Sequence, residues 1–542
     1  MQNAFQILLL FLSGTTLSVA QFPIDPSDSG AGGFPQPAGA STPVCGNYTN
    51  AIDLTVKLPP RSQNCLEMTG GFTGFSGSFA GLAYTSKNLL HLGEEIRIGA
   101  EDSVRRRATY LRIERPSLLG KSFDIGGLVY GQRFQYDQNR ESSLLAFDRN
   151  LSEFDSFDPE NLQRYVSYNY GASGWLRYRF HKSFSAGVAY SYDVADVRLL
   201  TSSTGNYSAF LSPQYLSNTG AIPALHFDGF DHLSTPTEMK GIHTSKLTPS
   251  FTFSGLDDLV RPTRGAALRI NLGIAGLGGN VNLVEPSVEA RYFHRGFNPH
   301  HVLAIRLRGQ MLRGYGDHDP PAFDRYSMGG EDELRGFNSW SITPFGYIPE
   351  VGFVDLLNPD GTTRLVAGVN SSGQRILVPE IIAVQTYQLA SLGGDTKSIA
   401  NLEYRIPLHS SWSLTLFDDT GFDRVSFRDQ LHLDSGSIFS LNNQLGHTAF
   451  GDLPLVETRT MAIRMSTGAE VSFLPKKLQI PIRFYAAYNP LVNHSPLQAP
   501  LLVDRSYFPN LATFNAAAAA FNTPTPAREP RFLFRFAIGR TF

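Results

Sequence analysis

The chain has 542 residues, of which only 17% are charged, and its net charge is -2. This balance excludes a nucleic-acid-binding surface, which needs a clustered excess of Lys and Arg. Aromatic residues reach 12%, with 39 Phe and 22 Tyr, and Gly is frequent at 50. The mixture is more typical of alternating β-strands than of a helical membrane protein, and one large closed sheet would account for a length above that of a usual single domain.

The first residues form the pattern of a secretory signal. A short apolar run from Ile7 to Leu12 is followed by small and polar residues, with Ser18 and Ala20 at the small-residue positions of a cleavage site. The run is too short to span a bilayer, which takes about 20 apolar residues. We therefore predict a signal peptide over residues 1–20, although its start lacks the usual positive charge. A flexible leader rich in Pro, Gly and Ser is predicted over residues 21–50.

Two cysteines, Cys45 and Cys65, flank a short segment after the leader begins. A cleaved signal would place both in the oxidising periplasm, where a disulfide can form. A disulfide between them and two unrelated thiols are both open. Neither has a CxxC partner or a nearby His, so we expect no metal or redox site.

From Thr69 onward, apolar and polar side chains alternate in a long series of segments separated by turn residues. In Leu268–Ile274 the leucines and isoleucines share one face while Arg269 and Asn271 share the other, because successive side chains of a strand point to opposite faces. The same alternation recurs in the segments 176–180, 303–308 and 402–406.

Many of these segments alternate for about ten residues, the length that a tilted strand needs to cross the hydrocarbon layer. Strands can lie in a bilayer only if their sheet closes, because an open edge would leave backbone groups unpaired in lipid. The pattern therefore predicts an all-β fold, a closed antiparallel transmembrane β-barrel. A soluble secreted β protein is the alternative, since the signal of each single strand is weak.

The connections are predicted to alternate between short turns and long loops. Residues 261–265 (RPTRG) form a turn pattern, because Pro presets one dihedral angle and Gly allows a positive φ. Long extracellular loops are expected at residues 338–398, 441–458 and 492–530. The alanine run 516–520 is compatible with a helical turn, but we expect an irregular filler segment there.

The final segment, RFLFRFAIGRTF, alternates and ends on an aromatic residue; its pattern comprises Phe534, Phe536, Ile538, Gly539 and Phe542. A terminal aromatic residue on an alternating last strand resembles the recognition signal carried by outer-membrane barrel proteins. An ordinary exposed tail is the alternative, but such a tail seldom holds bulky apolar residues in register.

The segment FDRYSMGGEDELRGFNSW contains a glycine pair and an arginine-containing tetrad: Gly329, Gly330, Leu334, Arg335, Gly336 and Phe337. It resembles the signature of the BamA/TamA family, a glycine pair followed by (V/I/L)-Arg-Gly-(Phe/Tyr) in the long sixth extracellular loop. The resemblance implies a barrel of about 16 strands. It also implies that this loop inserts into the lumen, where its arginine binds acidic residues of the wall.

The segment SIANLEYRIPLHSSWSLTLFDDTGF resembles two consecutive strands of the same family. The second carries a Phe-x-Asp-x-Gly element, here Phe417, Asp419 and Gly421. Alternation places Asp419 and Glu403 on the lumenal faces of their strands. We expect Arg335 to bind both carboxylates through charge-assisted bonds, with a bidentate geometry that Lys does not reproduce.

The resemblance covers residues 50–542. Residues 51–64, which contain the alternating strand AIDLTVKL, resemble the last strand of a POTRA module, and the barrel is expected over residues 65–542. Members of the family carry complete POTRA domains that dock periplasmic partners, whereas the stretch before Leu66 is too short for an independent core. A barrel-only member and a truncated gene start are both open.

The resemblance implies a protein of the bacterial outer membrane that assists the insertion of outer-membrane proteins or the translocation of proteins. The first strand, near residues 66–82, and the last, residues 531–542, would form a seam that opens laterally and templates an incoming strand. The implied partners are outer-membrane lipids, unfolded outer-membrane or secreted proteins and periplasmic assembly partners. No nucleic acid is expected.

A passive channel or structural barrel without assembly activity is the alternative function. Arginines on the predicted lumenal faces would favour anions in an open pore or serve ordinary solvation of the lumen; they are Arg177, Arg179, Arg269, Arg306, Arg308 and Arg405. An enzyme is not expected, because there is no G-x-S-x-G element, and His294, His300 and His301 lack the spacing of a metal or triad site. We predict no catalytic residue, cofactor or metal.

Overall fold

The computed structural model describes residues 54–56, 64–73, 77–118, 122–138, 162, 164–199, 238–258, 262–316, 318–369, 371, 373–409, 411–433, 435–474, 482–499, 505–522 and 524–538. The signal peptide and the leader predicted over residues 1–50 lie outside these described residues, as do Cys45, Gly539 and Phe542. Signal cleavage and the disulfide between Cys45 and Cys65 therefore stay predictions.

A single antiparallel sheet forms the body of the protein. In the described part of the chain it contains 18 strands, of which β1 (Leu54–Val56) and β13 (Arg313–Gly314) are short marginal pieces. The others follow one another in chain order as antiparallel neighbours: β2 (Asn64–Thr73), β3 (Gly77–Lys87), β4 (Glu95–Ser103), β5 (Arg106–Leu118), β6 (Phe123–Asp137), β7 (Arg164–His181), β8 (Phe184–Leu199), β9 (Glu238–Ser254), β10 (Gly265–Ala275), β11 (Leu283–Arg295), β12 (Val302–Met311), β18 (Thr396–His409), β19 (Trp412–Arg424), β21 (Arg464–Phe473), β22 (Ile482–Leu491) and β23 (Phe532–Ile538).

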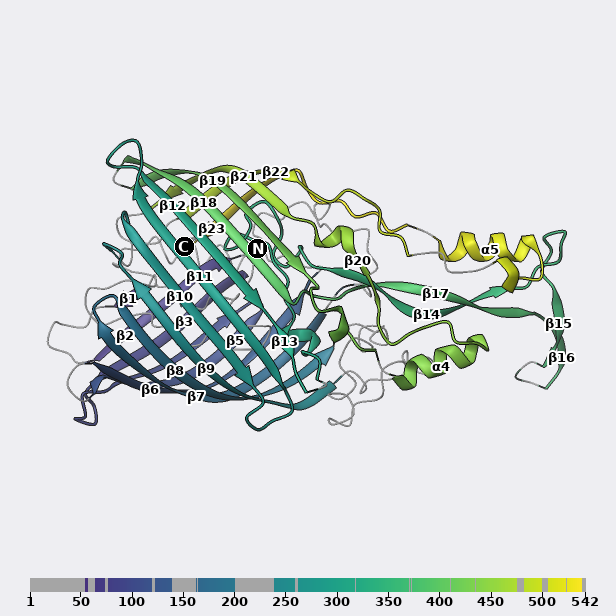
Figure 1. Cartoon of the computed structure of the whole chain (residues 1–542), viewed down its shortest axis with the longest axis horizontal. Helices are drawn as coiled ribbons and strands as arrows, with labels where there is room; N and C mark the ends of the chain where they lie inside the picture. The colour runs from purple at the N-terminus through teal and green to yellow at the C-terminus, as the bar shows by residue number, and fades with distance from the viewer. Residues whose placement is uncertain are drawn as a thin grey trace.

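The last strand also pairs with the first, through Phe72 of β2 and Ile538 of β23. The predicted antiparallel β-barrel of about 16 strands is thereby confirmed (Figure 1). The strand expected within residues 51–58 contains β1, which pairs with Leu66–Met68 of β2.

Side chains alternate between the outer and inner faces of the barrel along the strands. On β12, Leu307 is 52% exposed, whereas its neighbours Arg306 and Arg308 are 3% and 4% exposed. On β10, Ile270 and Leu272 are both exposed on the outer face. An apolar outer band and a polar inner face are what a closed sheet in a bilayer requires.

The connections differ in length between the two ends of the barrel. At one end, β9 and β10 are joined by a turn in which Asp257 accepts hydrogen bonds from the backbone N–H groups of Thr263 (2.9 Å) and Arg264 (3.0 Å). At the other end, β12, β19 and β22 are followed by long connections, residues 312–395, 425–463 and 492–531. This arrangement agrees with the alternation of turns and loops predicted from the sequence.

Parts of these three connections form an extension beyond that end of the barrel (Figure 1). Its elements and those of the connecting segments are η4 (Ala322–Asp324), β14 (Phe345–Asp355), β15 (Leu365–Val369), β16 (Arg375–Pro379), β17 (Ile381–Ser391), η5 (Arg428–Gln430), α4 (Ser435–Leu445), β20 (Leu455–Glu457), η6 (Thr458–Met461), η7 (Arg505–Tyr507) and α5 (Leu511–Phe521). Strand β14 lies between β17 and β20 in a three-stranded sheet, and β15 pairs with β16 in a separate hairpin.

The alanine run 516–520 belongs to helix α5, so the expectation of an irregular filler segment was wrong. The side chain of Asn510 caps this helix by accepting a hydrogen bond from the N–H of Thr513 at 2.9 Å. Alanine has the highest helix propensity, and Ala517 is buried in an apolar cluster with Val384 of β17. This packing stabilises a helix that would be marginal alone. None of the helices in the described ranges is long and apolar enough to cross a bilayer.

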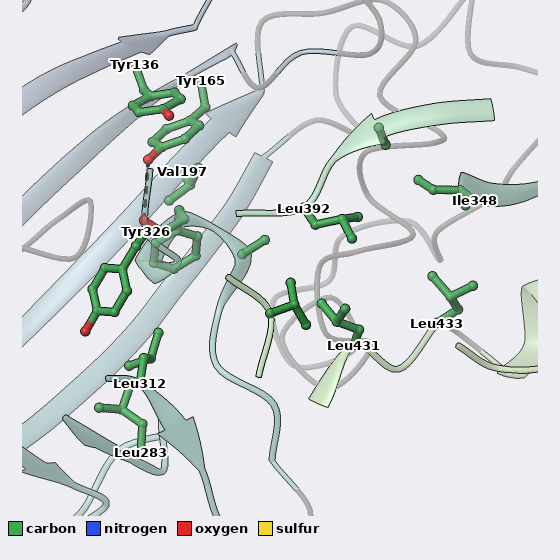
Figure 2. Packing of buried hydrophobic residues seen from close by; sticks show 14 of the residues in the cluster. Tyr136, Tyr165, Val197, Leu283, Leu312, Tyr326, Ile348, Leu392, Leu431 and Leu433 are labelled. Carbon is green, nitrogen blue, oxygen red and sulfur yellow. Dashed lines mark hydrogen bonds between the residues drawn. The ribbon is translucent and has the colours of Figure 1, made fainter. Parts of the chain in front are cut away.

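A large apolar cluster connects the rim of the barrel to the extension. At the rim, Tyr136 of β6 and Tyr165 of β7 stack on each other (Figure 2), and their ring centroids are 5.0 Å apart. Leu392, Leu433 and Ile348 continue the same cluster toward the extension. Burial of these side chains anchors the long connections on the barrel, because removing apolar surface from water is favourable.

The alternation of faces gives a direct test of the barrel. Lys in place of Ile270, at the middle of the outer face of β10, should lower the free energy of unfolding by about 2–4 kcal/mol, because the charge would enter the hydrocarbon layer. Lys in place of the neighbouring Asn271, which faces the lumen, should have a much smaller effect. Urea titration of the two variants in lipid vesicles measures both values, and equal losses would contradict the assigned faces.

Candidate functional site

The connection after β12 returns into the lumen before it reaches the extension. Met328 and Ile342 exchange two backbone hydrogen bonds, of 2.9 and 3.0 Å, and within this ring the N–H of Gly330 donates to the C=O of Phe337 at 3.0 Å. Residues 326–342, here called the lumenal loop, bind lumen-facing side chains of β6, β18, β19, β22 and β23.

Glycines allow the tight path of the lumenal loop. Gly329, Gly330 and Gly336 have φ angles of 125°, 92° and 93°, a region that other residues rarely adopt. A Cβ atom on Gly336 would lie 2.3 Å from Oδ1 of Asn489 on β22, and one on Gly329 would lie 2.1 Å from the carbonyl oxygen of Asn338. The glycines of the loop motif therefore serve both the turns and the close packing.

Arg335 has no exposed surface. Its Nε and Nη2 donate to the two carboxylate oxygens of Asp419 on β19 at 2.7 and 2.9 Å, and its backbone N–H donates to the same carboxylate at 3.0 Å. Its Nη1 lies 2.8 Å from Oε1 of Glu403 on β18 and 3.6 Å from Oε2 of Glu470 on β21. We call these four residues the Arg335 lock. The structure thus brings together the arginine and the two carboxylates expected from the sequence, and adds Glu470.

The charges around the Arg335 lock balance. Glu403 also pairs with Arg405 at 2.7 Å, and Glu470 pairs with Arg483 at 3.3 Å, so guanidinium groups and carboxylates are equal in number. Burial acts to lower the pKa of Arg335, but the surrounding carboxylates outweigh it and raise that pKa above its ordinary value. The arginine therefore stays charged, in a network that avoids the large penalty of a single buried charge.

The Phe-x-Asp-x-Gly element supplies successive lumen-facing positions of β19. The guanidinium carbon of Arg335 lies 3.9 Å from the centre of the Phe417 ring, which is a cation–π contact. Asp419 binds the guanidinium from the next such position. Gly421 leaves room for the loop, because a Cβ atom there would lie 3.0 Å from Cδ1 of Leu334. Each residue of the element therefore has a separate electrostatic or steric role in holding the lumenal loop.

Several polar residues that hold the loop were not predicted from the sequence. Nδ2 of Asn401 donates both to Oδ1 of Asp419 and to the C=O of Glu333, each at 2.8 Å. Nζ of Lys397 donates to the carboxylate of Glu333 at 2.8 Å. Lys397 and Asn401 share their lumen-facing parity with Glu403, a signal that was present in the sequence. Only the folded loop shows what these side chains bind.

The lumenal loop also binds the last two strands. Nδ2 of Asn489 on β22 donates to the C=O of Gly336 at 2.5 Å. Nη2 of Arg535 on β23 donates to Oδ1 of Asn338 at 2.5 Å. Both loop residues lie within three positions of Arg335, so the lock region is tied to the wall up to the final strand.

The other side of the lumenal loop contacts β6, far around the barrel from β18 and β19. The centroid of the Trp340 ring lies 4.6 Å from that of the Tyr136 ring. The guanidinium carbon of Arg105 lies over the Trp340 ring, 4.6 Å from its centroid. Nε2 of Gln138 donates to the C=O of Trp340 at 3.3 Å, and the hydroxyl groups of Tyr136 and Ser327 are 2.8 Å apart. The loop therefore reaches across the lumen.

Five of the six arginines predicted on the lumenal face are paired with a carboxylate or buried: Arg177, Arg179, Arg306, Arg308 and Arg405. Arg177 and Arg179 approach the carboxylate oxygens of Asp124 at 2.6 and 2.9 Å. Arg306 and Arg308 of β12 are buried, and Arg306 donates to Oδ1 of Asn401 and to the C=O of Asp332. Charges that are already neutralised attract free anions weakly, so this arrangement favours an ordinary polar lining over an anion-selective surface.

A family model described as the Omp85 superfamily domain matches residues 88–495. This match covers most of the strands and the whole lumenal loop. The chain belongs to the Omp85 superfamily. It is therefore a protein of the bacterial outer membrane, and the family inferred from the loop and strand motifs is confirmed.

Relatives of this Omp85 superfamily member match over shorter stretches. It is 35% identical over 96 residues to outer membrane protein assembly factor BamA of Nitratidesulfovibrio vulgaris, which is 17% of this chain and 12% of the relative. It is 34% identical over 101 residues to sorting and assembly machinery component 50 homolog A of Xenopus laevis, which is 18% of this chain and 21% of the relative. The chain thus spans less than a quarter of the length of either protein.

A solved structure has the same fold. BamA from Haemophilus ducreyi lacking POTRA domains 1–3 superposes with a TM-score of 0.54, over 80% of this chain and 68% of that chain, at 16% identity. At this identity the likeness concerns the fold alone.

Replacement of Arg335 by Ala should lower the free energy of unfolding by about 3–5 kcal/mol, because the buried carboxylates would lose their partner. Arg335→Lys should restore only part of this loss, since Lys lacks the fork that meets Asp419. Urea titration in vesicles measures the change. Arg364, whose Nε lies 2.9 Å from Glu380 at the surface, provides the control: Arg364→Ala should change stability by about 0–1 kcal/mol. Similar effects of the two Ala variants would refute the lock.

Proposed function

We propose that this Omp85 superfamily member assists the insertion of unfolded outer-membrane proteins, or the passage of secreted proteins, through a seam between β2 and β23. Weak pairing at that seam carries the proposal. Among the described residues, β2 and β23 share the single pair Phe72 and Ile538. By contrast, each of the 10 residues of β2 pairs with β3, and each of the 7 residues of β23 pairs with β22.

Most of β23 therefore has one neighbour. Phe532 to Ala537 pair with β22, and no described residue pairs with them on the side of β2. An edge of this kind presents backbone N–H and C=O groups that an incoming strand can bind. Phe532 and Phe534 point outward and are 62% and 71% exposed, so the outer side of this edge is apolar, as a strand entering lipid requires.

The lumenal loop supports the same seam from inside the barrel. Its hydrogen bonds with Asn489 and Arg535 hold β22 and β23, while the Arg335 lock ties it to β18, β19 and β21. Arg335 acts in this proposal as a structural latch and forms no covalent bond. It keeps the C-terminal side of the seam in place, so that opening moves the β2 side.

The proposed partners are unfolded outer-membrane or secreted proteins, outer-membrane lipids and periplasmic assembly partners. The relatives named above are an assembly factor and a component of a sorting and assembly machinery, which supports substrates of this kind. The proposal needs no enzymatic step, since backbone pairing and burial of apolar side chains supply the driving force for insertion.

The alternative of a passive channel predicts an open lumen. The lumenal loop instead bridges the lumen from Trp340 near β6 to Arg335 near β19. Planar-bilayer recordings of the purified protein should therefore show a small conductance, and a large stable conductance without assembly activity would favour the channel.

A disulfide across the seam tests the proposal. Cys at positions 72 and 538, in a chain whose Cys45 and Cys65 are replaced by Ser, would have Cα atoms about 4.5–5.5 Å apart, within disulfide reach. We expect the reduced protein to accelerate folding of a model outer-membrane barrel into liposomes. Oxidation should abolish the acceleration because the closed seam offers no edge, and a reducing agent should restore it.

A disulfide elsewhere in the wall is the matched control. Leu82 on β3 and Ala100 on β4 also lie opposite each other, in a fully paired part of the sheet. Oxidation of a Leu82→Cys/Ala100→Cys variant should leave acceleration unchanged. Full activity of the oxidised seam variant would exclude lateral opening, and lack of acceleration by the folded, reduced protein would exclude autonomous assembly activity.

A further inference from the structure

The ribbon formed by β14 and β17 is covered on its two faces. On one face, Val384 of β17 packs with Ala517 of α5. On the opposite face, the Tyr387 ring meets the Phe450 ring edge-on at 5.5 Å, next to the cluster that contains Leu441 of α4. Figure 1 shows the two helices on opposite sides of the ribbon. Its two faces are therefore packed, and its edges are the sites at which a further strand could bind.

The two edges of the ribbon differ. The base of the β14 edge pairs with β20 through Phe345–Tyr347, and farther out β14 carries Pro349, Glu350 and Asp355, residues that hinder pairing with a further strand. Strand β17, with the sequence IIAVQTYQLAS, has no charged residue and no Pro. Among the described residues β14 is its only paired strand. The β17 edge thus lacks the usual protection of an edge strand.

The hydrogen-bond phase shows which backbone groups this edge presents. Leu392 donates its N–H to Pro344 at 2.9 Å, and Leu356 donates to Glu380 at 2.7 Å. Since antiparallel hydrogen-bonded pairs recur at every second residue, the even-numbered residues of β17 bond to β14. The odd-numbered residues therefore direct their N–H and C=O groups away from it; in the more exposed half of the strand these are Ile381, Ala383, Gln385 and Tyr387.

We propose that the outer edge of β17 binds an extended, uncharged segment of another polypeptide by β-augmentation. Backbone hydrogen bonds to residues 381–387 supply the affinity, and the lack of charge on β17 selects uncharged side chains. The bound segment continues the sheet β20–β14–β17 and shares with it the cover of α4 and α5. This site lies on the extension, and the proposal does not depend on opening of the seam.

Symmetry excludes a second copy in the same membrane as the occupant. Two such copies are related by an axis along the membrane normal, and the ribbon projects away from the barrel in roughly that direction (Figure 1). A two-fold rotation about this axis places equivalent residues at equal height. Each outward N–H would then face an N–H, and no ladder could form. The proposed occupant is therefore a segment of a different protein outside the long-loop end of the barrel, and a segment of this chain that already pairs with the edge is the outcome that hydrogen exchange detects.

Hydrogen exchange of the intact protein in nanodiscs tests the edge directly. In the free protein, the N–H groups of the odd-numbered residues 381–387 should exchange at least tenfold faster than those of residues 382, 384 and 386, which bond to β14. Equally slow exchange would show that the edge is already paired and would overturn the proposal.

Peptide selection tests the binding. The probe is a phage library of random nine-residue peptides, selected against the wild-type protein in nanodiscs. Enriched peptides should bind at least tenfold more weakly to Ala383→Pro, which removes an outward N–H without breaking the β14 ladder. The Ala383→Val variant, whose new side chain is similar in size to that of Pro, keeps the backbone N–H. It should bind these peptides as tightly as the wild-type protein does. Absence of enriched peptides, or equal binding to Ala383→Pro and Ala383→Val, would overturn the proposal.

Discussion

The buried charge of Arg335 is the constraint on which the lumenal structure depends. A guanidinium group without exposed surface is tolerable only if fixed carboxylates surround it, and Asp419, Glu403 and Glu470 come from three different strands. The charge can be satisfied only when β18, β19 and β21 are in register and the loop has folded back. The lock is therefore a consequence of the closed wall and at the same time a brace for it.

The sequence predicted those parts of the site that depend on strand parity. Alternation fixed the lumenal position of Asp419 and Glu403, and the loop motif identified Arg335. Residues whose role depends on the three-dimensional path of the loop were missed, as for Arg535, which binds Asn338 from 197 positions away in the chain. Helix α5 was missed for a related reason, because the packing of Ala517 against β17 adds a tertiary contribution that an alanine run does not show.

Two strand edges with different surroundings follow from this architecture. The edge of β23 lies in the barrel wall, where lipid cannot satisfy backbone groups, and the lumenal loop stabilises it from inside. The edge of β17 lies beyond the barrel, on a ribbon whose faces are packed by helices. Recognition in both cases is proposed to depend on backbone hydrogen bonds, which explains how one protein could accept segments of varied sequence.

Disulfide formation across the seam measures directly whether pairing of β2 with β23 depends on the Arg335 lock. In the protein with Cys at positions 72 and 538, the rate of disulfide formation under a mild oxidant reports how often β2 and β23 are paired. Arg335→Ala should slow disulfide formation at the seam, because β23 loses its brace, and should leave the rate unchanged for a cysteine pair at positions 82 and 100. An unchanged rate at the seam would show that the Arg335 lock and the seam are independent, and that the lumenal loop does not brace β23.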